Sequence, residues 1–72
     1  MYVKGSNGVI VFDPEVIAVR ELAPYGTELF FGVVVTKRGR DYLLASYRDE
    51  GLAAQNAMVI ADAVIDGRPV SL

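Results

Sequence analysis

The sequence contains no cysteine and no histidine. Without cysteine neither a disulfide nor a thiolate metal site can form, and without histidine the common zinc ligand sets cannot be assembled. The serines also lack the histidine that usually activates a nucleophilic hydroxyl. The acidic residues follow no spacing typical of a metal-binding loop. We therefore expect a protein that is not an enzyme and that has no catalytic residue, metal ion or cofactor.

Long hydrophobic runs are absent as well. No apolar run approaches the roughly 20 residues that span a bilayer, and the N-terminus lacks the basic and apolar regions of a signal peptide. The net charge of −2 and the sequence pI of about 4.8 argue against general affinity for nucleic acid. We expect a cytoplasmic protein that has neither a membrane nor nucleic acid in general as a partner.

The chain has 72 residues, which suits one domain covering residues 1–72. A single core of this size seldom contributes more than roughly 3–5 kcal/mol, and small proteins usually add a disulfide, a metal or self-association. The first two are excluded here, and 53% of the residues are hydrophobic. Self-association is therefore the expected source of extra stability.

The stretch from Glu28 to Ser46 has the pattern of a β-hairpin. Residues 29–36 and 41–45 are rich in β-branched and aromatic side chains, and the charged segment 37–40 between them contains glycine. Successive side chains of a strand point to opposite faces. Both faces of residues 29–36 are apolar, so both need to be covered.

The preceding residues contain further strand patterns. Residues 2–12 predict a hairpin around the turn formers at 5–8, and residues 23–27 predict a loop. Residues 16–22 are favoured as a strand by their β-branching, although a short helix is an alternative because no helix breaker interrupts them. The prediction is an α+β fold with one antiparallel sheet of about five short strands.

A single helix is expected at the C-terminal end of the chain. Ser46 is the predicted N-cap, residues 47–66 the helix, and Gly67 its C-terminal stop. The tail, residues 68–72, either frays or pairs with an edge strand. One helix covers only one face of a sheet, so the other face remains open.

A helical wheel at about 100° per residue divides the helix into two arcs. The arc expected to pack on the sheet holds Ala53, Ala54, Ala57, Met58, Ile60, Ala61, Val64 and Ile65. The opposite arc carries an apolar stripe of Leu52, Val59 and Ala63 among polar residues. Exposed apolar surface of this extent usually marks a partner site. We therefore expect a homo-oligomer, most simply a two-fold dimer, with Phe30, Val34, Leu52, Val59 and Ala63 at its interface.

The basic hairpin tip is the best local candidate for a ligand site. Lys37, Arg38 and Arg40 surround a glycine and are suited to hold a phosphate, with Arg48 as an additional cation. Tyr42 or Tyr47 would stack on an aromatic ring of the ligand. The alternative interpretation is that these charges only keep the turn soluble and prevent unwanted strand pairing.

The layout of the chain resembles a group of small phage and prophage-type proteins. The resemblance is carried by Tyr2-Val3-Lys4 with Asn7-Gly8, and by the segment from Tyr42 to Tyr47 running into Asp49-Glu50 and Ala53. In that group a few antiparallel strands lead into one C-terminal helix. The chain departs from it in Gly51 and in its long alanine-rich helix. The resemblance implies binding of a host protein or sequestration of a nucleotide signal, and it carries over no site residue.

Two functions are thus open at this point. In the first, a small oligomeric binding module acts through protein–protein association. In the second, a phage-type anti-defence protein sequesters a phosphorylated nucleotide signal of host defence in a pocket formed by the oligomer.

Overall fold

The computed structural model describes residues 1–23 and 28–72 and has an α+β fold. The elements are β1 (Tyr2–Lys4), β2 (Ile10–Phe12), β3 (Val16–Leu22), β4 (Phe30–Lys37), β5 (Arg40–Tyr47), α1 (Glu50–Asp66) and β6 (Val70–Ser71). The predicted loop at 23–27 lies outside the described residues except for Ala23. The α+β class and the single C-terminal helix are confirmed.

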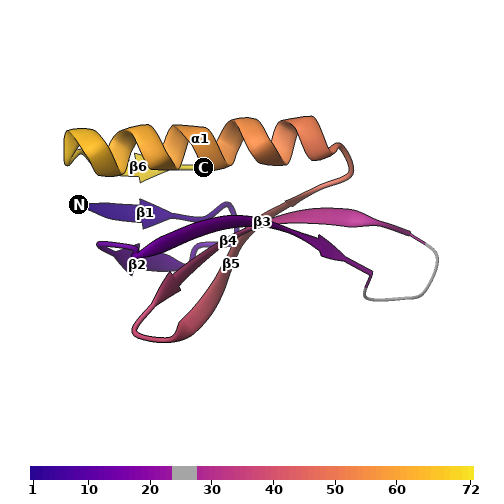
Figure 1. The fold of residues 1–72 in the computed structure, drawn as a ribbon, viewed down its shortest axis with the longest axis horizontal. Helices are drawn as coiled ribbons and strands as arrows, with labels where there is room; N and C mark the ends of the chain where they lie inside the picture. The colour runs from indigo at the N-terminus through magenta and orange to yellow at the C-terminus, as the bar shows by residue number, and fades with distance from the viewer. Residues whose placement is uncertain (24–27) are drawn as a thin grey trace.

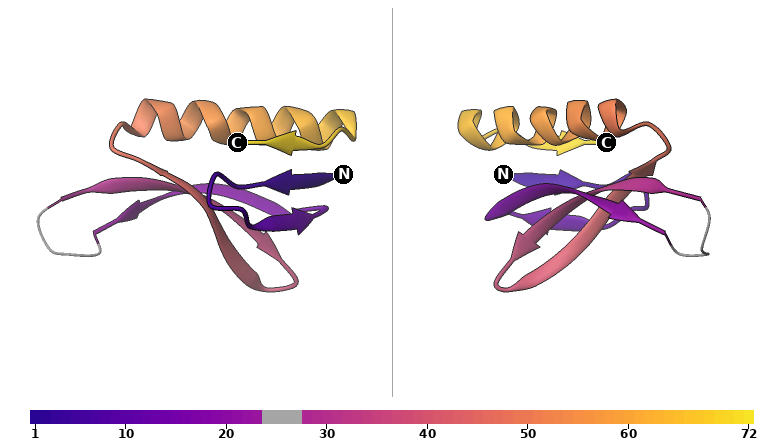
Figure 2. Two further views of the ribbon diagram at one scale, coloured as in Figure 1. Left: turned by 180° about the vertical axis from the view of Figure 1, so that it is seen from behind. Right: turned by 45° about the vertical axis from the view of Figure 1, so that its right-hand side comes forward.

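The strands form two three-stranded sheets, so the prediction of one sheet is wrong. Sheet A has the order β2-β1-β6 and sheet B the order β3-β4-β5. The chain leaves sheet A at Asp13, which has a φ of 47° and is followed by Pro14. Proline restricts the residue before it and cannot donate to a ladder, so β2 does not continue as a partner of β3. The left view of Figure 2 shows sheet A in front and sheet B crossing behind it.

The C-terminal tail is ordered and completes sheet A. Val70 pairs with Val3 and Ser71 with Lys4, both in a parallel arrangement. The Leu72 N–H donates to the Lys4 carbonyl at 2.8 Å. Of the two alternatives for the tail, pairing with an edge strand is therefore the correct one.

The turn at residues 5–8 joins the two sheets. The Ser6 N–H donates to the Leu44 carbonyl at 2.9 Å, and Asn7 Nδ2 donates to the Leu43 carbonyl at 2.8 Å. These carbonyls lie where the β4–β5 register shifts between Val33 and Val34. A Cβ atom on Gly5 would lie 2.5 Å from the Leu44 oxygen, so only glycine allows this approach.

Residues 16–22 form a strand, as favoured from the sequence, and pair with β4 in seven consecutive antiparallel pairs. The β4–β5 hairpin is confirmed as well. Its two turn residues, Arg38 and Gly39, have φ values of 52° and 76°. Positive φ at both central residues defines a type I′ turn, whose twist matches that of the flanking strands.

Helix α1 begins three residues later than predicted. Asp49 is the N-cap, and its carboxylate accepts from the Gly51 N–H at 2.7 Å. Ser46 and Tyr47 belong instead to β5, because strand pairing continues to Phe31 and Tyr47. The predicted stop is confirmed, since Gly67 has the left-handed φ of 70°.

The core lies between the two sheets and the helix that covers them (Figure 1). Its largest fully buried side chains are Leu44, Ile60, Val3, Val33 and Val35. The helical wheel is partly wrong, because Met58 and Ile65 are 66% and 82% exposed whereas Ala63 is completely buried. Val34 is only 6% exposed within the single chain. Ala63 and Val34 are therefore not part of an open interface surface.

Candidate ligand-binding site

A depression of about 440 Å³ lies between β2 and the β4–β5 turn. It is lined by Ile10, Val11, Phe12, Lys37, Arg38, Arg40 and Tyr42. Four of the six residues that the sequence predicts for a ligand site are therefore together. We call this depression the tip site.

The link between β2 and β3 holds the hairpin tip in place. Lys37 Nζ donates to the Asp13 carbonyl at 3.0 Å, and the Arg38 N–H donates to the Glu15 carboxylate. The Glu15 N–H in turn donates to the Thr36 carbonyl at 2.9 Å. These bonds hold in place the turn that carries the three cationic side chains. The tip is therefore anchored on the side of β3 as well as by its own ladder.

The apolar part of the tip site comes from the outward face of β2. Side chains alternate along this short strand, so Val11 enters the core while Ile10 and Phe12 remain 50% and 65% exposed. The Phe12 ring meets Tyr2 edge to face at a centroid distance of 6.0 Å. Phe12 thus has one aromatic neighbour and an otherwise accessible ring.

Ile10 and Phe12 were missed in the sequence-based site. Alternation in residues 10–12 indicates that both share a face opposite Val11. The sequence does not show that this face ends beside the turn of another hairpin, because that proximity depends on how the two sheets pack.

The electrostatics of the tip site favour an anion. The Asp13 carboxylate is occupied by the N-terminal ammonium group at 2.8 Å, and this hydrogen bond and charge lower the pKa of Asp13. The acceptor for Lys37 is a neutral carbonyl. Within residues 1–23 and 28–72, the side chains of Arg38 and Arg40 form no ion pair. Three cations therefore face the depression without a carboxylate bound to any of their side chains.

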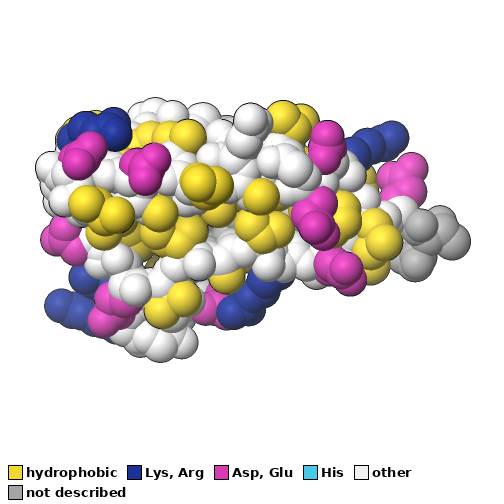
Figure 3. All heavy atoms as spheres, turned by 45° about the horizontal axis from the view of Figure 1, so that its top comes forward, with side chains coloured by type: hydrophobic (Ala, Val, Ile, Leu, Met, Phe, Trp, Pro, Cys, Tyr) yellow, Lys and Arg dark blue, Asp and Glu magenta, His cyan; other side chains and the backbone are white. Residues whose placement is uncertain are grey.

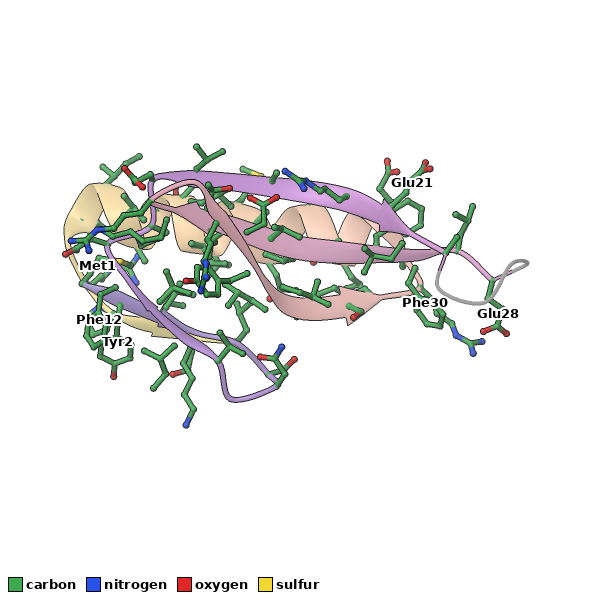
Figure 4. The ribbon with its side chains drawn as sticks, turned by 90° about the horizontal axis from the view of Figure 1, so that it is seen from below. Met1, Tyr2, Phe12, Glu21, Glu28 and Phe30 are labelled. Carbon is green, nitrogen blue, oxygen red and sulfur yellow. The ribbon has the colours of Figure 1, made fainter. Side chains whose placement is uncertain are left out.

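Arg48 and Tyr47 lie at the far end of β5 and do not reach the tip site. Tyr47 lies seven residue steps along β5 from Arg40, which corresponds to about 23 Å of strand. Arg48 is 3.5 Å from the Glu28 carboxylate, and its guanidinium lies 5.6 Å from the centre of the Phe30 ring. Figure 4 shows Tyr2 and Phe12 at one end of the molecule and Glu28 and Phe30 at the other.

A second depression, of about 740 Å³, lies at the Phe30 end. It is lined by Glu21, Leu22, Ala23, Glu28, Phe30, Leu43 and Ser46. A Cβ atom on Gly32 would approach both Leu22 and Leu43 to less than 3 Å, so these two side chains close over the glycine. The walls of this second depression are apolar and its charged residues are acidic, so it is poorly suited to bind a phosphate.

Comparison of the chain with protein-family models, curated protein sequences and solved structures finds no match. Among the described residues, no group of three or more acidic side chains is placed to hold a metal ion. Over the same part of the chain, no helix has the length and apolar character needed to cross a membrane.

Proposed function

We propose that the protein is a non-enzymatic binding module whose tip site takes a phosphorylated nucleotide. The observation that carries this proposal is the meeting of Lys37, Arg38 and Arg40 with the exposed Phe12 ring in one depression. Arginine donates paired hydrogen bonds to phosphate oxygens, and lysine supplies a compact positive charge. An aromatic ring offers a stacking surface to a base.

The two halves of the tip site explain the class of ligand. A bare phosphate would use the cations and leave Phe12 and Ile10 exposed to water. A nucleoside would use the apolar part and leave the guanidinium groups without a partner. A nucleotide satisfies both halves, so its affinity should exceed that of either fragment by more than tenfold.

Thermal-shift titration tests the proposal directly. The panel consists of nucleoside monophosphates, cyclic nucleotides, ADP-ribose, adenosine alone and inorganic phosphate. A ligand present at about 100 times its Kd adds about 2.7 kcal/mol, a shift of many degrees for a domain of this size. We expect such a shift for at least one phosphorylated nucleotide. Absence of a shift with every nucleotide would contradict the proposal.

The double variant Arg38→Ala, Arg40→Ala removes the unpaired guanidinium groups and should abolish the shift. Charge-assisted hydrogen bonds contribute about 1.5–3 kcal/mol each, so the loss exceeds tenfold for either residue alone. Arg48→Ala is the matched control, because this exposed arginine stands at the other end of β5. Equal losses from both variants would point to a nonspecific effect of net charge.

A role as a phage-type anti-defence protein would be one use of such a site. The alternative role of the tip charges, solubility alone, predicts no saturable binding and is separated by the same titration.

A further inference from the structure

Strand β3 has the longest open edge in the part of the chain that the structure describes. It pairs with β4 on one side and has no strand on the other. The outer strands of sheet A are only three and two residues long. The edge of β5 is partly covered by the turn at 5–8, whose Ser6 N–H binds the Leu44 carbonyl. The seven residues of β3 therefore present alternate N–H and C=O groups outward.

The open edge also lacks the features that usually prevent strand pairing. Edge strands are commonly shortened, bulged, or supplied with proline or lysine. Residues 16–22 contain neither proline nor lysine, and their register with β4 is continuous over all seven pairs. Their only charges are Arg20 and Glu21. This edge is suited to receive another strand.

An apolar flank of α1 adjoins this edge. Helical periodicity separates a flank with Ala54, Met58, Ala61 and Ile65 from the flank of Leu52, Val59 and Ala63. In the latter flank Ala63 is fully buried, whereas Leu52 and Val59 are 47% and 45% exposed. The former is the more exposed of the two flanks, with Met58 at 66% and Ile65 at 82%, and α1 contacts β3, so this flank is available beside the open edge. Figure 3 shows hydrophobic side chains in a band along this face of the molecule.

We propose that a second copy of this chain docks on this surface, with β3 pairing antiparallel to β3 about a two-fold axis at Val19. This register pairs all seven residues and places Val16 opposite Leu22. It sets Ala18 opposite Arg20, so no like charges are opposed. An axis at Arg20 would instead place two arginines against each other, which is destabilising.

The two-fold axis keeps both helices on the same side of the joined sheet. The exposed Met58 and Ile65 side chains of one copy then meet those of the other, and the alanines between them allow close approach. A stable interface buries about 800 Å² per partner. That area is about a sixth of the 4662 Å² surface of the chain. The open strand edge and the exposed flank of α1 would both contribute to this area.

This interface differs from the one predicted from the sequence, which used the Leu52 and Val59 side of α1. It is also independent of the tip site, whose lining from β2 and the hairpin turn does not include β3 or α1. A monomeric variant should therefore retain nucleotide binding, so the two proposals can fail separately.

Sedimentation or light scattering tests this dimer in the full chain. The wild-type protein should have twice the 7.8 kDa chain mass at micromolar concentration. Met58→Lys with Ile65→Lys should return it to 7.8 kDa, whereas the matched control Leu52→Lys with Val59→Lys should leave the dimer intact. All four side chains are at least 45% exposed, so the fold should persist in circular dichroism.

Two further measurements address the strand itself. Val16→Lys, at a position 54% exposed, should also produce the monomer, and hydrogen exchange in residues 16–22 should accelerate at least tenfold in every monomeric variant. A wild-type mass of 7.8 kDa at millimolar concentration would overturn the proposal. A dimer broken by the control pair but not by the Met58 and Ile65 pair would overturn it as well.

Discussion

Arg20 and Asp41 form an ion pair across the outer face of sheet B, with 2.7 Å between Nη1 and Oδ2. Arg20 is paired with Gly32 in the register and Asp41 with Thr36, so the ion pair crosses over Val34 between them. This arrangement explains why Val34 is buried although no helix in the described part of the chain covers that face. The second apolar face is therefore covered in part by polar side chains of the same chain.

The ion pair between Arg20 and Asp41 makes the free energy of unfolding depend on pH. Hydrogen bonds from Thr36 and then Arg20 lower the pKa of Asp41 from its usual 3.8. A carboxyl group with a lowered pKa in the folded state contributes stability above its unfolded pKa, and this contribution is lost as the pH falls through the folded value. Asp41→Asn should therefore be less stable than the wild type at pH 7.

The difference in melting temperature between Asp41→Asn and the wild type should shrink steadily below about pH 4. Thermal unfolding from pH 7 to pH 2 measures it. Asp62→Asn, on the exposed surface of α1, is the control. A deficit for Asp41→Asn that is as large at pH 2 as at pH 7 would show that the pair does not act through its charge.

Asn7 should be important for the packing of the two sheets. Its side chain donates to the Leu43 carbonyl and accepts from the Val9 N–H at 3.1 Å. Asn7→Ala removes both bonds and should cost about 1–2 kcal/mol, or roughly 4–16 °C in Tm. Asn56→Ala is the control, because its amide bonds only within α1. Stability of Asn7→Ala equal to that of Asn56→Ala would argue against this role.

The helix start offers a test of two candidate caps. Asp49→Ala removes the carboxylate that accepts from the Gly51 N–H and should cost about 1 kcal/mol. Ser46→Ala should change the free energy of unfolding by less than about 0.5 kcal/mol, since Ser46 is an exposed residue of β5. Urea unfolding of both variants decides the matter. The reverse order of stability would restore Ser46 as the cap.

The local structure was largely predictable because it depends on neighbouring residues. The hairpins, the strand at 16–22, and the helix stop at Gly67 follow from alternation, β-branching and glycine geometry. The predicted helix start was wrong because Ser46 and Asp49 are both good N-cap residues. Which of them caps the helix depends on where β5 ends, and its pairing with β4 continues to Phe31 and Tyr47. The second sheet was missed because the parallel pairing of Val70 with Val3 joins the two ends of the chain.

The tip site was partly predictable for the same reason. Lys37, Arg38 and Arg40 are neighbours in a turn, and Tyr42 follows on the same strand. Phe12 and Ile10 reach them only through the packing of sheet A beside the turn, which no local pattern indicates. Arg48 was assigned to the site because it follows the same hairpin, but a strand of eight residues carries it to the opposite end.

Chemical-shift mapping in an NMR titration with a phosphorylated nucleotide shows whether the ligand binds at the tip site. We expect saturable shifts confined to residues 10–12 and 37–42, and their loss in the Arg38→Ala, Arg40→Ala variant. The absence of saturable shifts, or shifts centred instead on Phe30 and Arg48, would contradict binding at the tip site.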